Sequence, residues 1–220
     1  MDPLSTLLAQ IQEGFDETAI AMAEADPDLL SARGPAGLRP ALVALYGGRQ
    51  GLAQELGALT PDLDLFEAAA LGDLDRLEAF AGSPDLRGHA RDGFTALHLA
   101  AFFGHPTAVD WLLDHGADAS AEARNGSGLR PLHSALAGRD ERAAFQITAA
   151  LLVRGADADA RQQGGYTALH AAAKRGCGPL VELLMGAGAD PALVTDQGQS
   201  ASDIAAAEGH LLLAERLRGT

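Results

Sequence analysis

Cysteine, lysine, aromatic residues and long apolar runs are all scarce in this chain of 220 residues. The single cysteine, Cys177, excludes an internal disulfide and fits a reducing compartment. No run approaches the roughly 18 apolar residues of a membrane span. The first residues also lack the basic and apolar segments of a signal peptide. We therefore expect a cytoplasmic protein that does not enter a membrane.

Acidic residues outnumber basic ones, and the imbalance is uneven along the chain. The net charge is −14, of which residues 1–81 carry −10 (14 acidic, 4 basic) and residues 82–220 carry −4 (16 acidic, 12 basic). Nucleic acids and anionic membranes are bound by clustered Lys and Arg, so neither partner is expected. The acidic surplus either keeps an alanine-rich chain soluble or steers a basic partner protein to the N-terminal part.

What the chain does contain is a repeated motif. Residues 95–98 read TALH, residues 130–133 read RPLH and residues 167–170 read TALH, at spacings of 35 and 37. A Gly-Ala-Asp triplet follows each copy, at residues 116–118, 155–157 and 188–190. Such a period indicates a stacked array in which each unit buries its apolar face against its neighbours. An elongated array has no central cleft, which favours binding over catalysis.

The units resemble ankyrin repeats over residues 91–220. The family pattern is a hairpin turn, T-P-L-H-x-A-A, a Gly-His pair, a second helix and Gly-Ala-Asp. Residues 92–101 (DGFTALHLAA) with Gly104 and His105 carry one copy, and residues 164–190 repeat it with Cys177 in place of the His. The resemblance is to bacterial-type members, since arginine supplies 15 of the 16 basic residues, as in a GC-rich genome. It implies an all-α solenoid of helix-turn-helix repeats with short connecting hairpin turns.

About seven units are expected in one domain spanning residues 1–220. They begin near residues 3, 34, 62, 90, 125, 162 and 195. Divergent units occupy residues 3–89, well-matched repeats residues 90–194, and a C-terminal capping unit residues 195–220. Residues 4–25 read as a helix pair broken near Gly14. Atypical terminal units are expected because each presents one face to water.

Individual residues suit their places in the repeat. Thr95 and Thr167 can cap a helix, because a hydroxyl accepts from backbone N–H groups that lack a partner. Pro131 sits in a first helical turn, where its missing N–H costs little. Gly104 and Gly176 end first helices, where glycine adopts a positive φ cheaply.

No catalytic residue, cofactor or metal site is expected. His98, His133 and His170 occupy the same slot of successive units. Stacked helices lie about 8–10 Å apart, whereas zinc holds its ligands about 2 Å from one centre, so these imidazoles do not converge on one ion. In the resembling family this His hydrogen-bonds the backbone between neighbouring turns, and the resemblance implies that role here.

A row of apolar and aromatic residues is the candidate binding site. In the ankyrin pattern, the hairpin tips and the ends of the first helices face outward on the concave side. Exposed aromatic residues grouped with arginine are typical of protein interfaces. The candidate partner-binding residues are Leu38, Tyr46, Phe94, Phe102, Phe103, Leu129, Tyr166, Lys174 and Arg175.

The hypothesis is a non-catalytic module, monomeric on its own, that binds another protein through this concave face. The aromatic side chains could instead pack against neighbouring hairpins and serve only the stack, although at least one of Phe102 and Phe103 is expected to be exposed. Two other functions stay open: a structural solenoid that assembles end to end, and an enzyme with an unrecognised site. The sequence does not identify the partner.

One unit carries extra residues. From His133 to Gly155 the chain runs four residues longer than in the neighbouring units. The charged stretch at residues 138–142 is the expected place of the insertion, in the turn between the two helices. A long loop on a rigid scaffold often carries function, but exposed turns also tolerate insertions.

Overall fold

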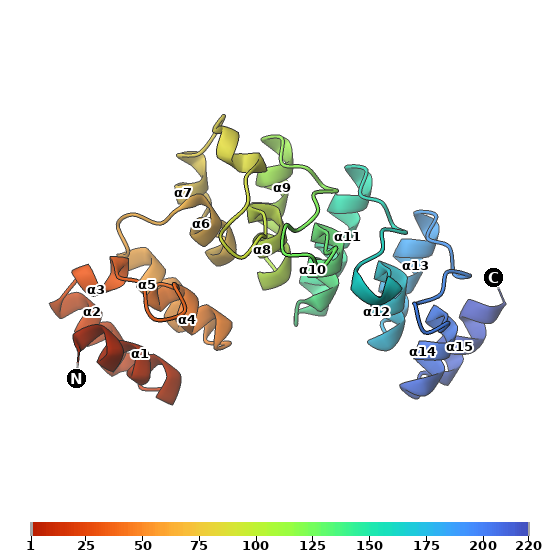
Figure 1. Ribbon diagram of the computed structural model, residues 1–220, viewed down its shortest axis with the longest axis horizontal. Coiled ribbons are helices and arrows are strands. Elements are labelled where there is room, and N and C mark those ends of the chain that lie inside the picture. Colours follow the sequence, from red (N-terminus) through yellow and green to blue (C-terminus); the bar gives the residue numbers. More distant parts are fainter. Residues whose placement is uncertain (1, 220) are drawn as a thin grey trace.

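The computed structural model describes residues 2–219 as helices stacked in pairs along an arc (Figure 1). The first helices of the pairs are α1 (Pro3–Glu13), α4 (Pro40–Tyr46), α6 (Leu65–Leu71), α8 (Ala96–Phe103), α10 (Pro131–Ala137), α12 (Ala168–Lys174) and α14 (Ala201–Ala207). The second helices are α2 (Asp16–Ala25), α5 (Gln50–Leu59), α7 (Leu74–Glu78), α9 (Pro106–Asp114), α11 (Glu141–Val153), α13 (Gly178–Gly186) and α15 (Leu211–Arg218). Short helices α3 (Asp28–Ser31), η1 (Pro84–Arg87) and η2 (Gln163–Gly165) lie in the connections. The predicted all-α solenoid of about seven repeats is confirmed.

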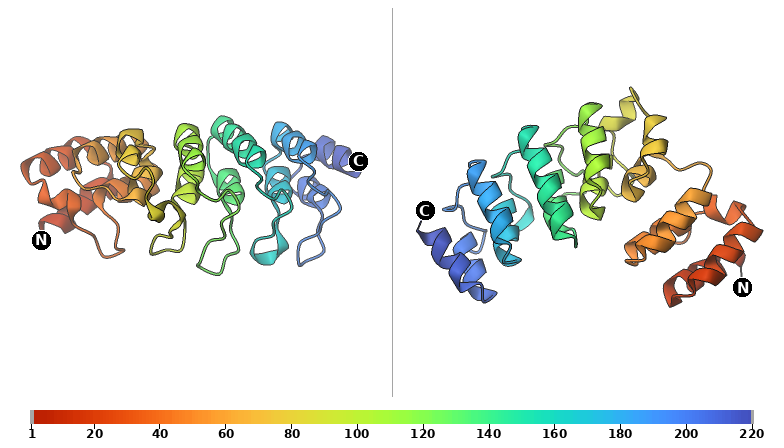
Figure 2. Two further views of the ribbon diagram at one scale, coloured as in Figure 1. Left: turned by 90° about the horizontal axis from the view of Figure 1, so that it is seen from above. Right: turned by 180° about the vertical axis from the view of Figure 1, so that it is seen from behind.

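The two kinds of helix occupy opposite sides of the arc. From α6 to α14 the first helices line the concave side, and α7, α9, α11 and α13 lie on the convex side (Figure 1). The connections between units project together in one direction as a row of loops, which Figure 2 shows from above. We call these loops fingers. The concave side therefore consists of first helices and fingers.

Local capping explains why the helices begin and end where they do. Thr95 caps α8 as predicted, because its Oγ1 accepts from the backbone N–H of His98 at 3.3 Å. Pro131 is the first residue of α10, where no N–H is needed. Gly14 ends α1 with φ +96° and separates it from α2, which confirms the predicted break.

Three histidines tie successive units together. The Nε2 atoms of His98, His133 and His170 lie 3.0–3.2 Å from the carbonyl oxygens of Leu129, Ala160 and Gln199, each in the next finger. Their Nδ1 atoms face the first residue of the repeat's TALH or RPLH stretch, where the backbone N–H donates to the ring. Both ring nitrogens are therefore used inside the stack, and the structural role that the resemblance implied is confirmed.

The third unit departs from this scheme in two ways. Only residues 60–64 connect α5 to α6, so no finger precedes α6. Glu67 stands at the third position of α6, where α8 carries its histidine. Its Oε2 accepts from Nη1 of Arg39, in the preceding unit, at 3.0 Å. The exposed fractions are 2% for Glu67 and 8% for Arg39, so this is a buried ion pair that links the unit backward.

The apolar core has two parts that meet at α6. One runs from Leu65 through α15, and the other covers α1 to α5. Helix α6 contributes Ala68 and Ala69 to the first part and Ala70 and Leu71 to the second. The buried ion pair of Glu67 therefore lies where the N-terminal core joins the rest of the stack.

The extra residues of the fifth unit lie in a helix. Helix α11 has 13 residues, against 9 in α9 and in α13, which adds about one helical turn. The inter-helix turn is only residues 138–140, so the prediction of a charged loop at residues 138–142 is wrong for Glu141 and Arg142. The reason is Asp140, whose Oδ1 accepts from the N–H of Ala143 at 3.0 Å and starts the helix early.

A matched pair of glycines tests how tightly units three and four pack. Gly72 and Gly82 both have a positive φ, of +70° and +78°. A Cβ atom added at Gly72 would lie 2.5 Å from Nδ1 of His105, whereas a Cβ atom added at Gly82 would have no atom within 4 Å. Gly82→Ala should cost about 1–2 kcal/mol for the backbone alone. Gly72→Ala should cost a further 1–3 kcal/mol or so from overpacking. Urea unfolding of both variants measures the difference, and equal losses would contradict the described contact.

Candidate functional site

The concave side has an aromatic cluster between the second and fourth units. The Tyr46 and Phe103 rings meet edge to face with centroids 5.1 Å apart, and Phe103 meets Phe102 in the same way at 5.0 Å. These units are not neighbours in the stack. Their side chains meet because the third unit has only Ala70 at the equivalent position and has no finger in front of it. Edge-to-face contacts of this kind hold aromatic rings in defined positions.

An apolar hollow of ≈ 240 Å³ opens beside this cluster. It lies between two fingers and the ends of α4, α8 and α10. We call it the central hollow, and it is lined by Tyr46, Phe94, His98, Leu99, Phe102, Leu129, Ser134 and Ala137. Four of the predicted binding residues (Tyr46, Phe94, Phe102 and Leu129) therefore come together in one place.

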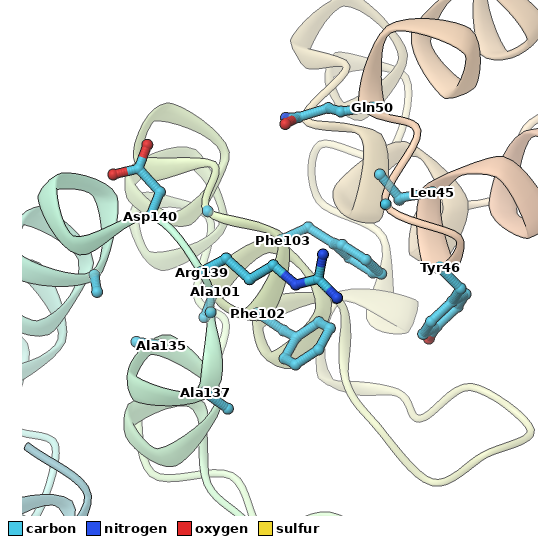
Figure 3. A pocket seen from close by; sticks show the side chains of 14 residues that line it. Leu45, Tyr46, Gln50, Ala101, Phe102, Phe103, Ala135, Ala137, Arg139 and Asp140 are labelled. Carbon is cyan, nitrogen blue, oxygen red and sulfur yellow. The ribbon is translucent and has the colours of Figure 1, made fainter. Parts of the chain in front are cut away.

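Two further hollows adjoin it. The end hollow, of ≈ 230 Å³, lies where the ends of α4 and α8 face the turn at residues 138–140 (Figure 3). It shares Tyr46, Phe102 and Ala137 with the central hollow. The finger hollow, of ≈ 550 Å³, occupies the place of the missing third finger, and the predicted residue Leu38 lines it. Tyr46 borders all three, so they adjoin one another, and we call them together the depression.

The exposed fractions of the predicted side chains differ. Tyr46 is 45% exposed and Phe102 is 39% exposed. This confirms that at least one of the paired phenylalanines is exposed. Phe103 is half-buried and packs against the N-terminal core, so it also supports the fold. Phe94 and Leu129 are half-buried at the bases of their fingers.

The remaining predicted residues lie outside the three hollows. Tyr166 is half-buried, with its ring against that of His170 at a centroid distance of 5.9 Å. Lys174 is exposed at the end of α12. Nη1 of Arg175 donates to the carbonyl oxygens of Leu136 (2.6 Å) and Gly138 (2.8 Å), so this guanidinium joins the sixth unit to the fifth. The structure therefore gives Arg175 a contact inside the stack.

Arg139 is the residue that sequence reasoning did not place in the site. Figure 3 shows its side chain extending from the turn before α11 toward the rings of Phe102, Phe103 and Tyr46. The guanidinium of Arg139 also reaches Gly48 of the second unit, because a Cβ atom added at Gly48 would lie 3.2 Å from Nη1 of Arg139. The only signal in the sequence was its position in the extra residues of the fifth unit.

The sequence pattern described as ankyrin repeats (3 copies) matches residues 65–146, and the one described as ankyrin repeats (many copies) matches residues 151–205. The chain belongs to the ankyrin repeat family. At the level of the family, ankyrin repeats are generally non-enzymatic domains that mediate protein–protein interactions.

Ankyrin repeats of animal proteins are among the relatives. Neurogenic locus notch homolog protein 2 of Homo sapiens is 37% identical over 188 residues, which is 84% of this chain and 7% of the relative. Neurogenic locus notch homolog protein 1 of Danio rerio is 35% identical over 178 residues, 81% of this chain and 7% of the relative. B-cell lymphoma 3 protein homolog of Mus musculus is 40% identical over 115 residues, 52% of this chain and 25% of the relative. This ankyrin repeat chain thus spans a small part of each relative.

The floor of the central hollow is uncharged at neutral pH. Burial lowers the pKa of the repeat histidine His98 to about 4. The hydrogen bond to the carbonyl of Leu129 acts in the opposite direction but is the smaller effect. Burial, and then the nearby charge of Asp92, raise the pKa of Tyr46. Both side chains are therefore neutral near pH 7, and the hollow suits an apolar group.

Within residues 2–219, no group of three or more His, Cys, Asp or Glu side chains is arranged to hold a metal ion. In the same part of the chain, no helix is long and apolar enough to cross a membrane.

Proposed function

We propose that the concave face of this ankyrin repeat array binds another protein, without catalysis, through the central hollow. The observation that carries the proposal is Phe102, an exposed aromatic residue beside an apolar hollow at the middle of the concave side. Aromatic anchors set against apolar hollows are typical of the residues that dominate binding energy in interfaces.

The size of the hollow supports a partner side chain as its occupant. Sites for small ligands and cofactors are usually about 300–1,000 Å³ in volume. At ≈ 240 Å³ the central hollow is smaller, and it is open to the concave face. The rings around it are held by their contacts with Phe103 and Tyr46, so binding would order few side chains.

The Phe102→Gln variant tests this function. Loss of an anchor residue typically weakens binding by about 30-fold or more, so the variant should lose the partner that the intact chain captures from a native lysate. Val153→Gln is the matched control, because Val153 is 83% exposed at the end of the convex helix α11. Mass spectrometry identifies the captured protein, and circular dichroism checks that both variants keep their helices.

A single substitution is preferable to replacing both phenylalanines. Phe103 packs against the N-terminal core, so a polar residue there would also destabilise the fold. Capture that survives Phe102→Gln and Val153→Gln equally would place the partner elsewhere on the array.

A second candidate function is end-to-end self-association. It is favoured by Leu211 and Leu212 at the start of α15, which are 64% and 84% exposed. We propose instead a cytoplasmic protein that is monomeric on its own. A mass above that of one chain by light scattering, reduced by Leu212→Gln, would favour self-association.

A further inference from the structure

The carboxylates and the arginines that line the depression differ in whether they have a hydrogen-bond or ion-pair partner. Four carboxylates line the three hollows, and each already has a partner inside the molecule. Asp64 and Glu67 pair with Arg33. Asp92 accepts from the N–H of Phe94 at 3.1 Å, and Asp140 caps α11.

Two arginines on the same lining have no such partner. Within residues 2–219, neither Arg139 nor Arg91 forms an ion pair or a hydrogen bond. Arg91 is exposed on the finger before α8. Arg139 extends toward the aromatic rings at the end hollow, and the neighbouring Asp140 points away from it (Figure 3). Asp92 and Asp140 keep their negative charges, but each already accepts a backbone N–H. Among the described residues, the guanidinium of Arg139 therefore has donors without a partner at the end hollow, and that of Arg91 has them at the finger hollow.

We propose that the site takes a segment of the partner that carries a bulky apolar side chain with an acidic residue next to it. This inference rests on the proposed function. The apolar side chain occupies the central hollow, and the carboxylate binds the guanidinium of Arg139 at the adjoining end hollow. The two hollows share Tyr46, Phe102 and Ala137, so one short segment spans both.

Physical chemistry favours a carboxylate at this position. A guanidinium presents a planar fork of donors that matches a carboxylate in two parallel hydrogen bonds. Arg139 is exposed, so its guanidinium is accessible to a carboxylate of the partner. Screening limits electrostatic interactions to about 8 Å at physiological salt, so most of the acidic surplus of residues 1–81 acts weakly at Arg139. Asp64 and Glu67, which do line the finger hollow, are paired with Arg33.

Peptide selection tests the inference on the full chain. A display library of random peptides is selected on the intact protein, and one enriched peptide is measured by fluorescence polarisation. We expect enrichment of a bulky apolar residue next to Asp or Glu. Arg139→Glu should weaken that peptide by about tenfold or more, because a charge-assisted hydrogen bond is lost and repulsion added. Arg142→Glu is the matched control, because Arg142 is exposed on α11 and lines none of the three hollows.

A double-mutant cycle makes the test specific. Changing the acidic residue of the peptide to its amide should reduce binding by a similar factor, and Arg139→Gln should then add little. Enrichment of apolar residues without acidic ones, or equal loss with Arg139→Glu and Arg142→Glu, would overturn the inference and leave the proposed function standing. Peptide binding that Phe102→Gln does not weaken would overturn both.

Discussion

Glu67→Gln should lower the free energy of unfolding by about 1–3 kcal/mol. Breaking a buried ion pair from one side typically costs about 3–5 kcal/mol, because the remaining charge is left buried without compensation. Here that charge is Arg39, which is 8% exposed. It keeps a second carboxylate, Asp62, at 3.0 Å, and burial already disfavours the charged form of Glu67, so the expected loss lies below this range. Gln retains an acceptor oxygen for the helix cap at Asp64, so the variant removes mainly charge.

Glu182→Gln is the control for this prediction. Glu182 also pairs with an arginine, Arg216, at 2.7 Å, but both side chains are about half exposed. Exposed pairs contribute about 0–1 kcal/mol, so this variant should be nearly neutral. Urea unfolding of the two variants compares the same substitution in a buried and an exposed pair. Equal and small losses would contradict a structural role for Glu67 at the junction of the two core parts.

The burial of Glu67 also limits what the ion pair contributes. Burial raises the pKa of its carboxyl group, even though Arg39 and Arg33 act in the opposite direction. The charged form is therefore disfavoured by desolvation, and replacement of the whole pair by apolar residues would not be expected to cost much. We infer that the pair specifies how the third unit joins the second, in the absence of a finger and of the usual histidine.

Acidification from about pH 7.5 to about pH 5 should lower stability by about 2 kcal/mol through His98 alone. Its pKa falls from an ordinary value of 6.5 to about 4 in the folded state, because burial disfavours the imidazolium. The unfolded chain therefore binds more protons between these two values. Stability is fully present above about pH 6.5 and is lost as the pH falls toward 4. Burial lowers the pKa of His133 and of His170 in the same direction, which adds to the loss.

His98→Gln separates this effect from other titrations. The variant loses the bond to Leu129 and should be less stable at neutral pH, but its stability should depend less on pH than that of the intact chain. The exposed His115, replaced in the same way, serves as the control. Thermal unfolding across the pH range gives the slopes. Identical slopes for the intact chain and His98→Gln would contradict the account of neutral histidines as ties between units.

Regular repeats were predictable from sequence because each residue there has a local cause. Thr95 caps helix α8, Gly14 ends helix α1, and His98 forms a hydrogen bond with the next finger. Each of these residues acts within its own unit or on the neighbouring one. In the candidate site, the sequence predicted the position of Phe102 and its exposure for the same reason: the frame of the repeat places it at the concave end of a first helix.

Contacts that skip a unit could not be predicted in this way. The meeting of Tyr46 with Phe103 depends on a small Ala70 and a missing finger between them, which are properties of three units together. The position of Arg139 depended on whether the extra residues of the fifth unit formed a loop or a helix. Asp140 decided this by capping α11, and the turn became short enough to bring Arg139 to the aromatic cluster.

The most direct test of the binding account is site-specific crosslinking in native lysate. A photoreactive phenylalanine analogue at position 102 and, separately, at position 153 compares the central hollow with the convex side while leaving the rest of the chain intact. We predict that a partner protein is crosslinked from position 102 and not from position 153. A partner crosslinked from position 153 alone, or equally from both positions, would contradict binding at the concave depression.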